Sequence, residues 1–229
     1  GSGPEQVVVK AVVSEQPTGS LNFGASYGKA DGIGLAISLS ESNFLGRGQF
    51  VSIDLNLGAK KATSSFTFAE PALLGRDLRL SFNGLYAQTE ANFATWDTRT
   101  VQLGSALEFP LSENGRFETR YTLSRSRMFN VPATASPILQ REAARNGLYG
   151  SALGYTYSWD NRRGGLAGNT AYVLRFSQDF YGIGGDLRYL KSEVFAGVET
   201  RVLNGEIRLR GEMEAGVVSG AKGGKGADG

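Results

Sequence analysis

The chain of 229 residues contains neither cysteine nor histidine. The absence of cysteine excludes a disulfide framework and thiolate metal sites. The absence of histidine removes the commonest general base and the commonest metal ligand, so histidine-activated nucleophiles are excluded and most zinc chemistry is disfavoured. We therefore expect no catalytic residue, no metal site and no cofactor, and we interpret the protein as a non-enzyme.

Long apolar runs and an excess of one charge are also missing. No stretch of about 18 apolar residues occurs, so the sequence predicts no transmembrane helix. Basic and acidic residues number 24 and 22, a balance that gives no electrostatic footprint for nucleic acid, and no nucleic-acid partner is expected. We expect no signal peptide, and we interpret the opening GSG (residues 1–3) as a remnant of cloning.

What the sequence does contain is an alternation of apolar and polar residues. In IGLAISLS, Ile33, Leu35 and Ile37 share one face, while small or polar residues share the other. The same period recurs in FVSIDLNL (50–57), LRLSFNGLY (78–86), VQLGSALEF (101–109), RFETRYTL (116–123) and YGSALGYTYSW (149–159). A period of two over many segments predicts β-strands, each with one apolar face.

The length of these segments and the placement of aromatic residues indicate what the apolar face contacts. The alternating stretches run to about ten residues, which is the length that a tilted strand needs to cross a bilayer. Aromatic residues gather near the predicted strand ends, as in the interfacial girdles of membrane barrels. They are Tyr27, Phe44, Phe50, Tyr86, Phe109, Phe129, Trp159, Tyr181 and Tyr189. These features favour a transmembrane barrel, and a soluble β-sandwich or lipocalin-like barrel is the alternative.

The predicted fold class is all-β, a transmembrane antiparallel up-and-down β-barrel. Turn signals divide the chain into about eleven strands, at 18–28, 33–42, 49–58, 62–70, 77–90, 98–110, 116–129, 148–159, 170–181, 188–203 and 206–218. Tight connections are predicted at 29–32, 112–115 and 203–206. Longer ones at 89–99 and 130–147 leave from the same end as YGIGGD (181–186). Tight turns on one side and longer loops on the other are typical of outer-membrane barrels.

One of the long connections is expected to contain a helix. Ser136 followed by Pro137 predicts a short helix over 137–145, and Gly147 ends it. No other helix is expected.

An odd number of strands prevents closure of the array on itself. The first and eleventh strands run in the same direction, whereas bacterial barrels of this kind have even strand numbers. We therefore expect an incomplete part of a larger barrel. Its lumen face is predicted to carry Arg79, Glu108, Glu118, Arg120, Arg175, Glu193, Glu199, Arg208, Arg210, Glu212 and Glu214. We interpret these side chains as a lumen charge network rather than as acid/base catalysts. The opposite face, with Leu35, Ile37, Val51, Ile53, Leu55, Phe82, Leu103 and Leu153, is expected to contact lipid.

Three motifs follow one another at the start of this array. PTGSLNFGASY (17–27) fits PTGS-x-x-FG-x-x-Y, SESNFLGRG (40–48) fits S-x-x-NFLG-x-G, and a turn with Glu70 and Pro71 comes next. This series resembles the BamA family of outer-membrane protein assembly factors, within the outer-membrane insertase superfamily. The resemblance extends more weakly through SWDNRRGGLAGN (158–169) to EMEAGVV (212–218). Related proteins such as the TamA family share NFLG-x-G, whereas the PTGS opening is more similar to the BamA family.

The resemblance implies a sixteen-stranded barrel in the bacterial outer membrane, preceded by periplasmic POTRA domains. On this basis residues 4–16, with VVVKAVV (7–13), are the end of the last POTRA domain. Residues 17–218 are the first part of the barrel, and 219–229 begin an extracellular loop. The implied partners are nascent outer-membrane β-barrel proteins, outer-membrane lipids, and accessory assembly lipoproteins that act through POTRA domains absent from this sequence.

The resemblance also assigns a function to the first strand. It implies that nascent barrel proteins are folded and inserted by β-augmentation at the edge of this strand. The client-binding residues are then Leu21, Asn22, Phe23, Gly24, Ala25, Ser26, Tyr27 and Gly28. The glycines at 24 and 28 would keep the edge easy to open, and the alternative is that they accommodate a bend. The alternative functions are a passive outer-membrane channel and a TamA-like translocation and assembly barrel.

Overall fold

The computed structural model describes residues 16–29, 32–90, 96–163, 169–203 and 206–220. Eleven strands form in these residues, and each of the eleven segments predicted above overlaps one of them. Their bounds are β1 Gly19–Gly28, β2 Gly32–Phe44, β3 Gln49–Gly58, β4 Lys61–Glu70, β5 Arg79–Thr89, β6 Asp97–Pro110, β7 Gly115–Phe129, β8 Leu148–Asp160, β9 Thr170–Gly185, β10 Tyr189–Val202 and β11 Ile207–Gly220. The expected cloning remnant (1–3), the predicted POTRA segment (4–16, except its last residue) and the part of the predicted loop at 221–229 lie outside the described residues.

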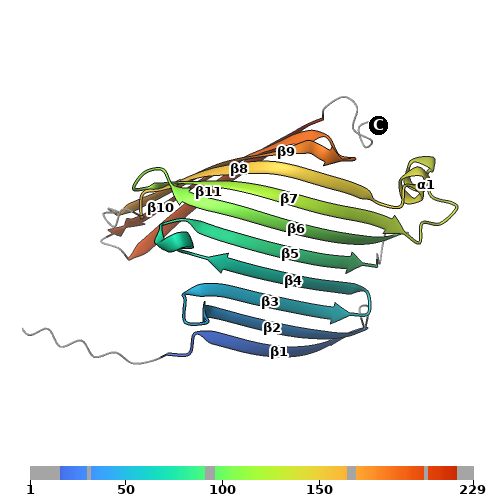
Figure 1. Ribbon diagram of the computed structural model, residues 1–229, viewed down its shortest axis with the longest axis horizontal. Helices are drawn as coiled ribbons and strands as arrows, with labels where there is room; N and C mark the ends of the chain where they lie inside the picture. Colours follow the sequence, from blue (N-terminus) through green and yellow to red (C-terminus); the bar gives the residue numbers. More distant parts are fainter. Residues whose placement is uncertain (1–15, 30–31, 91–95, 164–168, 204–205, 221–229) are drawn as a thin grey trace, which may run out of the picture.

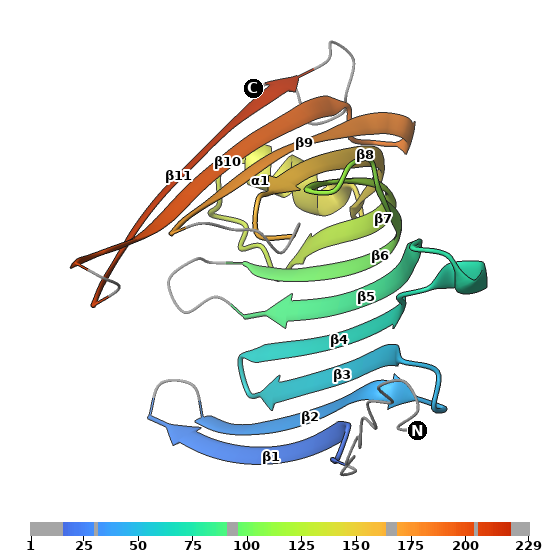
Figure 2. The same ribbon diagram turned by 90° about the vertical axis from the view of Figure 1, so that its left-hand side faces the viewer.

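All eleven strands belong to one antiparallel sheet in chain order, from β1 to β11 (Figure 1). The sheet is strongly curved, and Figure 2 shows β1 and β11 at the two ends of an open trough. Neither strand has a second neighbour in the described residues. The predicted all-β, up-and-down, unclosed arrangement is confirmed.

The two faces of the sheet differ as the alternation predicts. The strand registers place all the residues that we expected to contact lipid on the convex face, where Leu35, Leu103 and Leu153 are more than half exposed. The only buried apolar residues in the described part of the chain are Ala69 and Ala152. A sandwich would bury its apolar face against a second sheet. Because this sheet has a single layer, the soluble-sandwich alternative is wrong, and no second layer covers the convex face in the described residues.

The concave face carries the predicted lumen charges, all eleven of which share it by register. Arg120 of β7 makes two hydrogen bonds of 2.8 Å to the carboxylate of Asp179, which lies on β9. The intervening strand β8 presents Gly154 between them, and a Cβ there would overlap the Asp179 carboxylate. The glycine therefore opens the path for an ion pair that links three strands.

Some strand ends and connections differ from the prediction. GIGG (182–185), predicted as loop, completes β9, with positive φ at Gly182, Gly184 and Gly185 and a register shift opposite Gly150 and Ala152. β11 continues two residues beyond the predicted boundary, through Ser219 and Gly220. The tight connection at 29–32 joins β1 to β2 at the end that carries the long connections, whereas 112–115 and 203–206 lie at the other end. The division into tight and long ends is therefore only partial.

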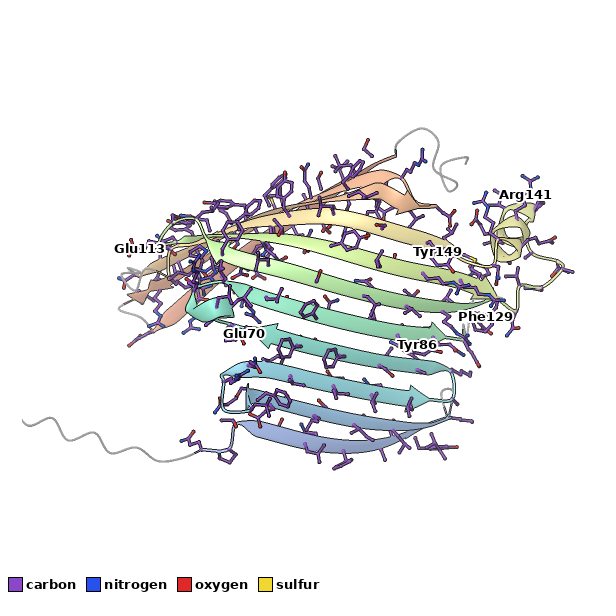
Figure 3. All side chains as sticks on the ribbon, viewed as in Figure 1. Glu70, Tyr86, Glu113, Phe129, Arg141 and Tyr149 are labelled. Carbon is purple, nitrogen blue, oxygen red and sulfur yellow. The ribbon has the colours of Figure 1, made fainter. Side chains whose placement is uncertain are left out.

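The two ends of the sheet can be followed in Figure 3. Glu70 and Glu113 mark one end, and Tyr86, Phe129 and Tyr149 mark the end that carries the long connections (Figure 3). At that end the predicted helix forms as α1, Pro137–Ala144, and the Leu139 amide donates to the Ser136 hydroxyl. A 3-10 turn at Leu73–Gly75 was not expected. No helix in the described residues is long and apolar enough to cross a membrane.

Candidate functional site

The first strand lies at an edge of the sheet. Among the described residues, β1 pairs with β2 alone, in a register that runs without interruption from Gly19 opposite Glu41 to Gly28 opposite Gly32. Its outward side chains, Leu21, Phe23, Ala25 and Tyr27, extend the apolar face of β2. Its inward ones lie opposite Ser38, Ala36 and Gly34.

One hydrogen bond fixes the direction of the main-chain groups along β1. The Ser42 amide donates to the Thr18 carbonyl at 3.0 Å, and these two residues are the next partners in the β1–β2 register. Hydrogen-bonded and non-hydrogen-bonded pairs alternate along an antiparallel ladder. The even-numbered residues of β1 therefore bond to β2. The N–H and C=O groups of the odd-numbered residues Gly19, Leu21, Phe23, Ala25 and Tyr27 point to the open edge.

The β1 strand lacks the features that usually protect an edge. Its sequence GSLNFGASYG has no charged residue and no proline, and its pairing with β2 contains no bulge. Phe23 and Tyr27 are 73% and 80% exposed. Edge strands are commonly blunted by lysine, proline or bulges, because unpaired main-chain groups invite another strand. Among the described residues, the open edge of β1 presents a row of unpaired main-chain N–H and C=O groups.

Gly24 is not required by the packing around it. A Cβ at this position would lie 3.6 Å from the Cβ of Ala36, an ordinary van der Waals distance, and its φ is not positive. No bulge bends the strand there. A concavity of about 790 Å³ extends along the inner side of the same stretch, with Ser26, Gly34 and Asn56 in its lining. Glycine in a strand costs roughly 0.5–1 kcal/mol relative to alanine, so Gly24 makes the β1–β2 seam less stable without a steric reason.

The other edge strand is different in character. β11 has 14 residues, and its inward positions carry Arg208, Arg210, Glu212 and Glu214. Arg208 pairs with Glu199 on β10 at 3.4 Å, and Arg210 donates to Glu212 within the strand. These charges restrict the strands that could pair beside β11. The uncharged, shorter β1 is thus the less selective of the two edges.

The structure separates the eight predicted site residues into two groups. Leu21, Phe23, Ala25 and Tyr27 present main-chain groups to the open edge, whereas Asn22, Gly24, Ser26 and Gly28 turn theirs to β2. Gly19 belongs to the first group and was not predicted. Alternation in the sequence shows which side chains share a face, but it does not show which main-chain groups bond to the neighbour. No cluster of three or more acidic side chains suited to a metal ion occurs in the described residues.

Comparison with known proteins identifies relatives along most of the chain. A model of the Omp85 superfamily domain matches residues 43–226. The chain is 24% identical over 220 residues to the outer membrane protein assembly factor BamA of Neorickettsia risticii (strain Illinois), covering 96% of this chain and 30% of the relative. It is 25% identical over 144 residues to BamA of Nitratidesulfovibrio vulgaris, covering 62% of this chain and 18% of that protein.

A solved structure has the same fold. The crystal structure of BamA from Haemophilus ducreyi lacking POTRA domains 1–3 superposes with a TM-score of 0.67 and 15% sequence identity, over 91% of this chain and 42% of that one. The eleven-stranded sheet is thus similar to part of a BamA barrel. The chain spans less than a third of the length of the curated relatives that it matches.

Proposed function

The chain belongs to the Omp85 superfamily of outer-membrane proteins, and from this premise we propose that it is part of an assembly factor for outer-membrane β-barrel proteins. In this proposal the β1 edge receives the strands of a nascent barrel protein. The observation that carries it is the uncharged β1 strand, whose odd-numbered residues direct their main-chain groups away from β2.

The physical problem that such an edge solves is the cost of unpaired main-chain groups in lipid. Each unsatisfied N–H or C=O group in the hydrocarbon layer costs several kcal/mol, so a strand cannot enter alone. A paired edge supplies those bonds by β-augmentation. Because the bonds involve the main chain, the edge accepts strands of many sequences. Because Gly24 makes the pairing of β1 with β2 less stable, β1 can move with the incoming strand.

The remaining features of the proposal concern partners rather than chemistry. No reaction step is assigned to any residue, and the carboxylates and arginines of the concave face form ion pairs in the lumen. Clients are nascent outer-membrane β-barrel proteins, and the convex face contacts outer-membrane lipids. Accessory assembly lipoproteins are proposed to act through POTRA domains that precede a sixteen-stranded barrel. The end with the long connections is proposed to face the exterior.

Site-specific crosslinking tests the proposal. A photoreactive phenylalanine analogue replaces Phe23 in the full-length protein, and in the control it replaces Phe66 of β4, which also faces outward but lies between β3 and β5. Phe23 is expected to crosslink to a nascent barrel protein in membranes, and Phe66 is not. Equal yields at the two positions would contradict the β1 edge and leave a passive channel as the function.

A further inference from the structure

Three arginines gather on the convex face at the end that carries the long connections. Arg99 of β6 lies directly opposite Arg127 of β7 in the register, and Arg125 is the next outward residue of β7. All three side chains are exposed. Like charges directly opposite each other on a sheet are destabilising, so this arrangement is unfavourable unless an anion lies between them.

None of the three arginines has a carboxylate partner among the described residues. Arg99 donates to the Gln88 amide oxygen at 3.0 and 3.2 Å and lies 5.3 Å from the Phe129 ring centroid. Arg125 lies 4.9 Å from the Tyr149 ring centroid. The nearest carboxylate along β6, Asp97, accepts a hydrogen bond of 2.6 Å from Asn130. Aromatic and amide contacts thus hold two of the guanidinium groups in place without neutralising them.

An apolar groove begins directly beside the arginines. It has a volume of about 710 Å³, and its lining includes the apolar side chains of Val101, Leu103, Leu123 and Ile183. Arg125, Tyr149 and Asp186 also line it, and the Asp186 carboxylate accepts a hydrogen bond of 3.1 Å from the Tyr149 amide. Figure 3 shows Phe129 and Tyr149 at this end of the sheet. Within the groove the Tyr121 and Ser151 hydroxyls bond to each other at 2.8 Å, so their polarity is satisfied.

The height of the cluster matches a membrane boundary. The aromatic pair of Phe109 and Phe117 marks the other end of β6 and β7, ten residues from Arg99 and Arg127 along each strand. At about 3.3 Å per residue and a tilt of about 45°, this distance is about 23 Å along the membrane normal. The apolar band of outer-membrane barrels is about 25 Å tall. The arginines therefore stand at the level of lipid headgroups.

We propose that Arg99, Arg125 and Arg127 form a binding site for a phosphate-bearing lipid, whose acyl chain occupies the adjoining groove. Guanidinium groups bind phosphate oxygens in a bidentate manner, and the negative charge of the phosphate is complementary to the positive charge of the opposed arginines. The apolar side chains that line the groove would contact the hydrocarbon of the acyl chain. On the orientation proposed above, the lipid lies in the outer leaflet.

Lipid titration of the full-length protein, followed by native mass spectrometry, tests the site. The probes are diphosphorylated lipid A, phosphatidylcholine and inorganic phosphate. The variant R99Q/R125Q/R127Q is compared with R76Q/R163Q/R201Q, which removes the same charge at the other end of the sheet. An arginine near an anionic lipid contributes about fivefold in affinity. We expect the first variant to bind lipid A on the order of 100-fold more weakly and the second to be unchanged.

A groove variant separates a lipid site from a simple anion site. Val101→Trp fills the groove and leaves the arginines in place, so it should weaken lipid A binding but not the binding of inorganic phosphate. Equal lipid A affinity in the wild type and R99Q/R125Q/R127Q, or an equal loss in both triple variants, would overturn the proposal. Displacement of lipid A by equimolar inorganic phosphate would also overturn it. These outcomes do not depend on the β1 edge, so they are distinct from a failure of the proposed function.

Discussion

Single residues on one strand already show the difference between the two faces. On β3, Ile53 points to the convex face, whereas Asp54 points inward and accepts hydrogen bonds from Ser38 at 2.6 Å and from Ser65 at 3.2 Å. Alternation in the sequence was sufficient to predict both orientations. A residue's face follows from its parity, because successive side chains of a strand point to opposite sides.

The same substitution on the two faces should therefore have unequal effects. Ile53→Arg places a charge near the centre of the apolar band and is expected to cost about 2–4 kcal/mol. Asn56→Arg, three residues along the strand and facing the lumen concavity, should cost much less. Unfolding of the two variants by urea in lipid vesicles measures this difference. Equal destabilisation would mean that neither face contacts lipid.

Other residue-level features could not be predicted from the sequence. Arg120 and Asp179 are 59 residues apart, and their ion pair depends on the empty space that Gly154 leaves on the strand between them. Arg120 and Asp179 come together only in the observed registers of the β7–β8 and β8–β9 ladders. Sequence patterns give parity within a strand but not the offset between strands, so the lumen location of Arg120 was predicted, whereas Asp179 was not among the predicted lumen charges and the pairing was not foreseen.

At the level of the element, β1 shows the same limit. Its position, length and apolar face were predicted, and the resemblance indicated a function for it. The direction of its main-chain groups followed only from the Ser42–Thr18 hydrogen bond. That direction divides the strand into residues that stabilise the β1–β2 seam and residues that face the open edge.

Proline substitutions distinguish these two groups. Ala25→Pro removes an N–H that points to the open edge and leaves the β1–β2 hydrogen bonds intact, whereas Gly24→Pro removes a bond to β2. Client crosslinking should fall on the order of tenfold or more in Ala25→Pro, because one unsatisfied group in lipid costs several kcal/mol. Barrel stability should fall mainly in Gly24→Pro. Ala25→Val keeps the N–H and is the control, and equal crosslinking by Ala25→Pro and Ala25→Val would refute this assignment.

For the whole molecule, strand number and order were predictable because each connection joins neighbouring antiparallel strands. The errors concentrate at the strand ends. Positive φ at Gly184 and Gly185 lets β9 continue through residues whose composition indicated a loop. Local glycine content therefore misled the prediction where the neighbouring strand β8 provided a partner. The general arrangement, a single curved layer with an apolar outer face, did not depend on these ends.

The arrangement predicts how deep each part of the sheet lies in a bilayer. Trp159 faces outward one residue before the end of β8, and Leu153 faces outward six residues earlier in the same strand. At about 3.3 Å per residue and a tilt of about 45°, the two side chains differ in depth by about 14 Å. This chain has only 2 tryptophans, so in the full-length protein, with every tryptophan outside this chain replaced by phenylalanine, Trp96→Phe leaves Trp159 as the single fluorophore. Adding Trp159→Phe and Leu153→Trp then moves the fluorophore to position 153. In bilayers of brominated lipid, Trp159 should be quenched best by bromine near the headgroups and Trp at position 153 best by bromine near the chain ends. The same depth preference for both fluorophores would be incompatible with a sheet that crosses the membrane along its strands.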